Sequence, residues 1–254
     1  MNYQNFPLEA QRRREPVFNL PPVIVALSAV LIAVHALRQF VSENTDLQIL
    51  LWAAFIPARY GNPGVLKDLL PGGLPADIWT FVTYAFLHGD WVHLGINLIW
   101  FLAFGSAVAW RFGAVRFLVF FAVTAAAGAL LHLFTQTSSA SQTAPLVGAS
   151  AAISGAMAAA MRFAFEAGGP LSAWRNSSPE VFRVPASPLL VALRNRQVLV
   201  FLGVWFLMNL LLAFTNWMTP FAEGTIAWQA HIGGFLAGLF LFPLFDPVAK
   251  PTFH

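Results

Sequence analysis

Long segments without charged residues separate short polar segments along most of the chain. Five stretches contain no Asp, Glu, Lys or Arg: residues 16–37, 91–110, 117–161, 197–222 and 224–245. A helix needs about 20 apolar residues to cross a bilayer, so each stretch is long enough to do so. The third stretch is far longer than one crossing requires, and the polar segment 135–145 divides it. It therefore predicts two helices joined by a loop.

Counted in this way, the pattern predicts six membrane-spanning helices. Their approximate ranges are 20–40, 88–109, 115–134, 147–165, 197–216 and 225–245. The predicted fold class is an all-α membrane protein, with a six-transmembrane-helix bundle over residues 20–246. Residues 1–19 form a short segment before this domain, and residues 247–254 form a tail after it. Six crossings place both termini on the same side of the membrane.

The distribution of basic residues predicts which side that is. Only three of the 14 Lys and Arg residues, Arg38, Arg59 and Lys67, fall in loops on the opposite side. Because basic residues accumulate in cytoplasmic loops, both termini are expected in the cytoplasm, and the expected location is a bacterial inner membrane. A cleavable signal peptide is the alternative for the first helix, but no convincing small-x-small site precedes Arg38.

Two of the loops are long. The outer loop 41–78 includes the apolar segment 47–56, which is too short to span the membrane and too apolar to lie free in water. An interfacial helix is expected there. The cytoplasmic loop 166–196 contains Gly168-Gly-Pro170 and several Arg residues, which predicts a flexible connector.

Composition narrows the function classes. Hydrophobic residues make up 58% of the chain and charged residues only 10%, which argues against a soluble globule. The absence of Cys excludes disulfides, thiolate metal sites and a Cys nucleophile. The net charge of +3 is explained by the bias of the loops, so the lipid bilayer is the expected partner and nucleic acid is not. No cofactor is expected.

Four polar residues fall at a similar depth in the predicted bundle. The second, fourth and sixth helices all run inward from the outer face. His93, Asn97, Ser150 and His231 lie three to seven residues from the outer ends of these helices. At 1.5 Å per residue, all four are within the outermost ~10 Å of the bilayer. Since His93 and Asn97 share a helix face, the side chains are expected to converge.

Small residues explain how the fourth and sixth helices would approach each other closely. Small side chains let transmembrane helices pack backbone to backbone. On their own these residues indicate only helix packing, which is compatible with chemistry at the same contact. They are Gly234 and Gly238, in a GxxxG pattern on the face of His231, and Ala151, Ser154 and Ala158 near Ser150.

The residue types predict a Ser-His dyad. A Ser hydroxyl is a weak nucleophile, so an adjacent imidazole must accept its proton and later return it to the leaving amine. Ser150 and His231 suit these roles. A third member is not evident, because Asp246 lies 15 residues, or ~22 Å, from His231. His93, Asn97 and backbone N–H groups at the start of the fourth helix could stabilise the oxyanion.

Each polar residue also has a simpler interpretation. A lone Ser in a transmembrane helix usually bonds to its own backbone, and a lone Asn often joins two helices. Intramembrane His residues are functional candidates by default, but His35 and His132 lie at outer helix ends and are expected at the interface. His254 is terminal. The co-location of four residues favours a site over chance.

Three segments around these residues form motifs. They are HGDWVHLGIN at 88–97, GASA at 148–151 and AHIGGFLAG at 230–238. In this order and spacing, the chain resembles the rhomboid intramembrane serine proteases over all six predicted helices. The resemblance implies a serine endopeptidase with Ser150 as nucleophile, His231 as base, and His93 with Asn97 in the oxyanion site. Single-span membrane proteins are the expected substrates, and because Ser150 lies near the outer face of the predicted bundle, the cut is expected near their extracytoplasmic boundary.

Three positions depart from the family pattern. Ala151 replaces the Gly that usually follows the nucleophile, and Ser154 replaces an aromatic that stacks on the catalytic His in many members. Thr80 replaces the Arg of a common Trp-Arg pair. None of these changes removes a catalytic group. They bear on the oxyanion geometry, the orientation of His231 and the anchoring of the first loop.

Two other functions are compatible with these residues. A rhomboid-like pseudoprotease would bind transmembrane segments without cutting them, although both members of the dyad are present. A haem or metal membrane protein would use His93 and His231 as ligands. The HExxH signature of zinc proteases is absent from the sequence, and no metal is expected.

Overall fold

The computed structural model describes residues 20–60, 70–136, 142–172, 179–218 and 227–248, and within these ranges the chain is helical and has no strand. An isolated antiparallel bridge pairs Phe55 with Leu146. The α-helices are α1 (Pro22–Arg38), α2 (Glu43–Ala53), α4 (Gly73–Thr83), α5 (Trp91–Trp100), α6 (Ser106–Phe112), α7 (Ala114–Thr135), α9 (Ser150–Ala160), α10 (Leu189–Ala192), α11 (Arg196–Met218) and α12 (Trp228–Phe245). Shorter helical turns are η1 (Pro57–Arg59), η2 (Tyr84–Phe86), the π-helical η3 (Phe101–Gly105) and η4 (Pro179–Arg183).

Several helix ends have causes in single residues. The N–H of His93 donates to Asp90 Oδ1 at 2.8 Å, so Asp90 caps α5. Ser42 caps α2 in the same way by accepting from the N–H of Thr45. Gly113, with φ of +78°, separates α6 from α7, and this left-handed conformation lets the chain reverse.

Four of the predicted spans correspond to helices long and apolar enough to cross a membrane, namely Trp91–Phe112, Ala114–Thr135, Arg196–Phe214 and Trp228–Phe245. The first and fourth predicted spans correspond to shorter apolar helices, α1 and α9. The fourth helix begins at Ser150 and not at the predicted residue 147. Residues 145–149, which precede it, are not helical. It ends at Ala160, after which the chain continues in turns with i to i−3 hydrogen bonds.

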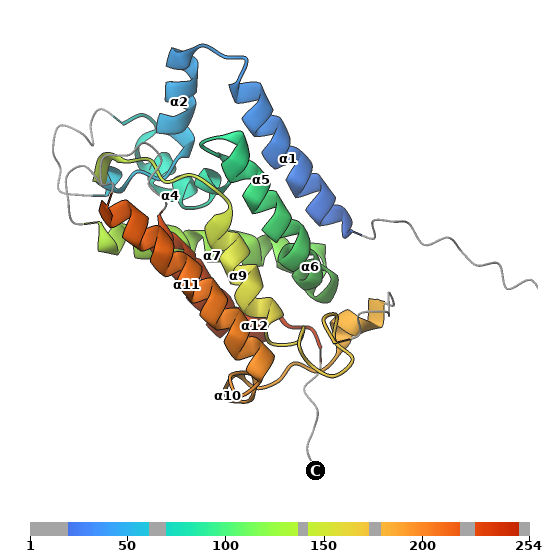
Figure 1. Cartoon of the computed structure of the whole chain (residues 1–254). Coiled ribbons are helices and arrows are strands. Elements are labelled where there is room, and N and C mark those ends of the chain that lie inside the picture. The colour runs from blue at the N-terminus through green and yellow to red at the C-terminus, as the bar shows by residue number, and fades with distance from the viewer. Residues whose placement is uncertain (1–19, 61–69, 137–141, 173–178, 219–226, 249–254) are drawn as a thin grey trace, which may run out of the picture.

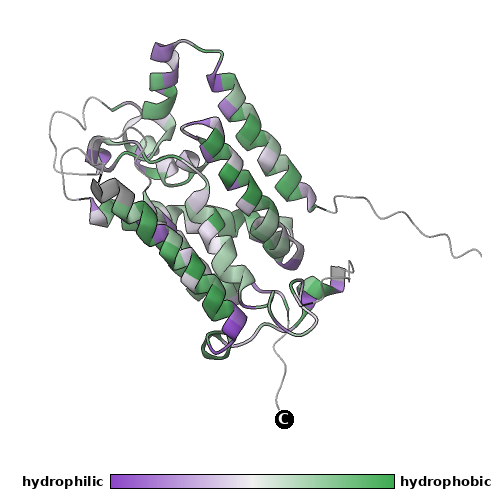
Figure 2. Ribbon diagram, viewed as in Figure 1, coloured by the Kyte–Doolittle hydropathy of each residue, from purple (hydrophilic) through white to green (hydrophobic). Residues whose placement is uncertain are grey.

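The most buried element is α9. In Figure 1 it lies in the middle of the bundle, between α5 and α11 in this view, with α2 at one end of the molecule and α10 at the other. All residues of α9 from Ala151 to Ala160 are buried. They are small or slender enough for α7 and α12 to pack closely on both sides. By contrast, only 11% of the most apolar stretch of α11 is buried inside the protein. Apolar residues predominate along this helix (Figure 2).

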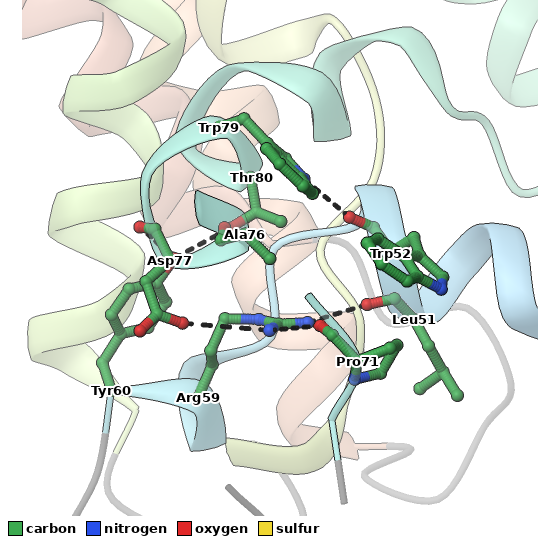
Figure 3. Close-up of polar contacts among 9 residues, drawn as sticks. All are labelled: Leu51, Trp52, Arg59, Tyr60, Pro71, Ala76, Asp77, Trp79 and Thr80. Carbon is green, nitrogen blue, oxygen red and sulfur yellow. Dashed lines mark hydrogen bonds and ion pairs between the residues drawn. The ribbon is translucent and has the colours of Figure 1, made fainter. Parts of the chain in front are cut away.

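The first loop is anchored by a buried guanidinium. Arg59 is only 2% exposed and donates hydrogen bonds to the carbonyl oxygens of Leu51 and Pro71 at 2.8 and 2.9 Å (Figure 3). Its Nη1 also lies 3.8 Å from Asp77 Oδ1. These bonds hold α2 and the start of α4 together. The predicted helix over the apolar part of this loop is present as α2, whose Leu47 is exposed.

The departure at Thr80 is accommodated by the same loop. Thr80 is fully buried, donates to the carbonyl oxygen of Ala76 at 2.7 Å and lies 2.8 Å from the hydroxyl of Tyr60. The neighbouring Trp79 indole donates to the carbonyl oxygen of Trp52 at 2.9 Å (Figure 3). Thr80 and Trp79 thus form polar contacts with the first loop, and the buried cation of this region is Arg59.

Part of the loop predicted as a flexible connector over 166–196 is hydrogen-bonded to the bundle. Arg111, buried at the end of α6, forms a bidentate ion pair with Asp246 and donates to the carbonyl oxygens of Phe182 and Val184. The Nε of Arg162 donates to the carbonyl oxygen of Ser187 at 3.0 Å. Buried Arg side chains bind several carbonyls at once, so this segment is fixed to the α10 end of the bundle.

Candidate active site

The segment that leads into α9 is held in place from both sides. Leu146 is paired with Phe55 of the first loop, and the N–H of Gly148 donates to the carbonyl oxygen of Tyr84 at 3.0 Å. Gly148 has φ of +116°, a conformation that favours glycine. Ser150 follows two residues later as the first residue of α9, and its side chain is partly exposed.

The packing of α9 on α12 fixes the level of Ser150 relative to His231. A Cβ atom on Gly234 would collide with the backbone oxygen of Ala151, and one on Gly238 with that of Gly155. Both pairs are 83 positions apart in the sequence, so the two helices run parallel in one register.

The same register places His231 level with Gly148 and Ser150 level with Gly233. The levels of the two side chains therefore differ by two residues, about 3 Å along the helix axes. His231, like Ser150, is partly exposed. Among the described residues no hydrogen bond joins them, and such bonds are often long when no substrate is bound.

His93 and Asn97 lie against Gly148. A Cβ atom built on Gly148 would be 2.8 Å from His93 Nε2 and 3.8 Å from Asn97 Nδ2. Asn97 is buried, and one N–H of its amide donates to the carbonyl oxygen of His93 at 3.0 Å. The structure therefore brings these two residues of α5 to the turn that precedes Ser150, at the level of His231.

The start of α5 is supported by polar contacts behind His93. The ring of His88 is fully buried and meets the ring of His93 edge-on, with centroids 5.1 Å apart. Arg38 donates to the carbonyl oxygen of His88 at 2.8 Å. The hydrogen bond from the backbone N–H of His93 lowers the pKa of the Asp90 carboxyl, so the cap is charged at neutral pH.

The side chain of His231 contacts Asn209, a residue for which the sequence gave no functional prediction. The Nδ1 of His231 lies 2.9 Å from the Oδ1 of Asn209 on α11. Asn209 is buried, and its Nδ2 donates to the carbonyl oxygen of Trp205 at 2.8 Å. A signal was present in the sequence, since Asn209 is seven residues from the outer end of the fifth predicted span, and His231 is six residues from the outer end of the sixth. Their depths therefore match.

The remaining histidines of the spans lie elsewhere. His35 is buried and packs edge-on against Trp91, with centroids 4.5 Å apart. His132 is buried, and its Nδ1 lies 3.0 Å from the amide nitrogen of Gln136. His254 is outside the described residues. The described part of the chain contains no group of three or more His, Cys, Asp or Glu residues arranged to hold a metal ion.

The departures at Ala151 and Ser154 have structural counterparts. The methyl group of Ala151 occupies the space that a Cβ on Gly128 of α7 would need, so the extra methyl is accommodated by a missing one across the contact. Ser154 is buried in α9. The aromatic stack nearest in sequence to His231 is formed by Trp205 and Phe235, with centroids 4.1 Å apart, one turn farther along α12.

Comparison with known proteins identifies relatives of this chain. A family model described as the rhomboid domain matches residues 75–246, well over half of the chain. A rhomboid protease GlpG from Klebsiella pneumoniae (strain 342) is 27% identical over 136 residues, which are 53% of this chain and 42% of that protein. A rhomboid protease GlpG from Enterobacter sp. (strain 638) matches with the same identity and coverage. The matched residues thus span less than half the length of these relatives.

Proposed function

Because the chain belongs to the rhomboid family and is an integral membrane protein, we propose that it is an intramembrane serine endopeptidase. Its expected substrates are single-span membrane proteins. The observation that carries this proposal is the register of α9 against α12, which brings Ser150 and His231 to nearly the same level. A hydroxyl and an adjacent imidazole can together carry out the nucleophilic hydrolysis of a peptide bond.

In the proposed mechanism, Ser150 is the nucleophile and His231 the general base. The Nε2 of His231 takes the hydroxyl proton as Ser150 Oγ attacks the scissile carbonyl carbon. The protonated imidazole then donates that proton to the leaving amine, and water repeats the sequence to release the acyl group. This assignment fits the partial exposure of both side chains, since substrate and water must reach them.

The start of α9 suits stabilisation of the oxyanion. Its N-cap residue, Ala149, provides no side-chain acceptor for the N–H groups of the first turn. Those N–H groups, which begin at Ser150, carry the positive end of the helix dipole. Asn97 adds a second amide N–H beyond the one bonded to His93, and the ring of His93 lies beside Gly148. Preorganised donors of this kind stabilise the charge that develops in the transition state.

The location of the site predicts where a substrate is cut. The starts of α5, α9 and α12 all lie toward the α2 end, whereas the exposed arginines of the described residues lie at the α10 end. They are Arg116, Arg183, Arg194 and Arg196. We place the α10 end and both termini in the cytoplasm, as in a bacterial inner membrane. Cleavage is then expected within a few residues of the extracytoplasmic boundary, in substrate segments that unwind readily.

Cleavage of defined substrates tests the proposal. The purified protein is incubated in detergent with a panel of single-span substrates, and product masses locate the cut. Wild type is expected to cleave at least one substrate near its extracytoplasmic boundary, and Ser150→Ala none. Equal product formation by the Ser150→Ala variant would contradict the proposal, and binding of the same substrates without cleavage by wild type would support a pseudoprotease instead.

A further inference from the structure

The buried contact between α11 and His231 carries a further inference. We propose that Asn209 is a positioning residue that fixes the ring orientation and the tautomer of His231. This inference rests on the proposed function, in which Ser150 and His231 are the catalytic pair. Asn209 would act as the third member of that site, for which the sequence offered no acidic candidate. Its evidence is the 2.9 Å separation of Asn209 Oδ1 from His231 Nδ1.

The hydrogen bonds determine which atoms of the Asn209 amide face which partner. The carbonyl oxygen of Trp205 only accepts hydrogen bonds, so the atom that donates to it at 2.8 Å must be the amide nitrogen. The amide oxygen therefore faces His231. Because that oxygen only accepts, the Nδ1 of His231 must carry the proton. In the neutral ring, Nε2 is then unprotonated and can accept the proton of Ser150.

The same bond becomes stronger during the reaction. When His231 takes the proton of Ser150, its ring becomes an imidazolium, and the Nδ1–H bond to Asn209 becomes charge-assisted. In serine hydrolases a carboxylate commonly accepts this bond, and in papain-like proteases an Asn does so. Here the acid at the end of α12, Asp246, is paired with Arg111 at the α10 end. A neutral amide spares the buried site a permanent charge.

The contact also bears on how α11 is attached. Trp205 and Asn209 lie one turn apart on α11 and meet Phe235 and His231, which lie one turn apart on α12. The alternative role for a polar residue at such a contact is purely structural, to join two helices. A purely structural role would lower thermal stability without changing the reactivity of Ser150 at temperatures where the protein is folded. The experiment must separate these two roles.

Two substitutions at position 209 and one matched control do so. Asn209→Leu keeps the branching and the number of side-chain heavy atoms but cannot accept a hydrogen bond, whereas Asn209→Asp retains an acceptor oxygen. Thr124→Val is the control, because Thr124 is buried on α7 and donates to the carbonyl oxygen of Phe120 as Asn209 does to Trp205, without contacting His231. Each variant is assayed well below its Tm for kcat, for KM and for the rate at which a fluorophosphonate labels Ser150.

Asn209→Leu is expected to lower kcat and the labelling rate about tenfold to a hundredfold with little change in KM. Asn209→Asp should recover most of the lost rate, and Thr124→Val should match wild type. Wild-type labelling by Asn209→Leu, or equal losses in Asn209→Leu and Asn209→Asp, would overturn the inference. Failure of the proposed function is a different result, in which Ser150→Ala cleaves substrate as fast as wild type.

Discussion

The close contact between α9 and α12 predicts that a single methyl group can disable the site without touching it. In Gly234→Ala, the added Cβ would lie 2.6 Å from the carbonyl carbon and 3.0 Å from the Cα of Ala151. Non-bonded carbon atoms prefer about 3.5–4.0 Å. Both obstacles are backbone atoms, so no side chain can rotate away. The two helices must separate locally by about 1 Å.

The expected cost is large for function and moderate for stability. Overpacking of this kind destabilises a fold by about 1–3 kcal/mol. A displacement of about 1 Å between catalytic groups can cost about a hundredfold in rate. Because Ser150 and His231 lie within one turn of this contact, Gly234→Ala should lower kcat by about that factor even where the protein is fully folded.

The assay compares two glycines. Gly203 lies in α11, and a Cβ built there meets no atom within 4 Å, so Gly203→Ala is a matched control. Alanine is favoured over glycine in helices by up to about 1 kcal/mol. Gly203→Ala should therefore keep wild-type kcat with an unchanged or higher Tm. Wild-type kcat in Gly234→Ala, measured below its Tm, would refute the register on which the site is built.

Three further predictions concern the surroundings of the site. Asn97→Ala should lower kcat about a hundredfold with little change in KM, because an oxyanion donor acts mainly on the transition state, and steady-state kinetics would show a raised KM alone if Asn97 only docked substrate. Arg59→Met should lower the free energy of unfolding by about 1–3 kcal/mol, since the carbonyls of Leu51 and Pro71 lose their donor; an unchanged Tm in thermal denaturation would be inconsistent with this. The pKa of Asp90 is lowered below 3.8 in the folded protein by its capping hydrogen bond, so its contribution to stability is complete above the unfolded pKa and is lost as the pH falls through the folded pKa. Thermal scans from pH 6 to about pH 2.5 should show a smaller acid-side loss for Asp90→Asn, which caps without titrating, and parallel curves would refute this.

Much of the helical architecture follows from local pattern. The charge-free stretches predict the apolar helices because a bilayer requires every backbone group to be bonded within its own segment. The six-span count stays a prediction, since four helices are long enough to cross and α1 and α9 are shorter. The segment before the late start of α9 includes the pairing of Leu146 with Phe55, a contact between distant segments that no local pattern encodes.

Some residues of the candidate site could be predicted from the sequence, and others could not. Equal spacing from the helix ends predicts that His93, Asn97, Ser150 and His231 lie at one depth, and the contacts of Gly148 and Gly234 agree with that placement. Asn209 was missed because a search for a charged third member passes over a neutral amide on a different helix. The anchoring role of Arg59 could not be predicted either, since its acceptors are backbone carbonyls that become neighbours only in the folded loop.

Activation of Ser150 by His231 is tested most directly by locating the covalent adduct of a fluorophosphonate with peptide mass spectrometry. If His231 activates Ser150, the phosphonyl group replaces the hydroxyl proton of Ser150 with loss of fluoride, and the adduct is found on that residue in wild type. The His231→Ala variant should remain unlabelled under the same conditions. An adduct on another residue, or labelling of Ser150 at the wild-type rate in His231→Ala, would show that Ser150 and His231 do not form a catalytic dyad.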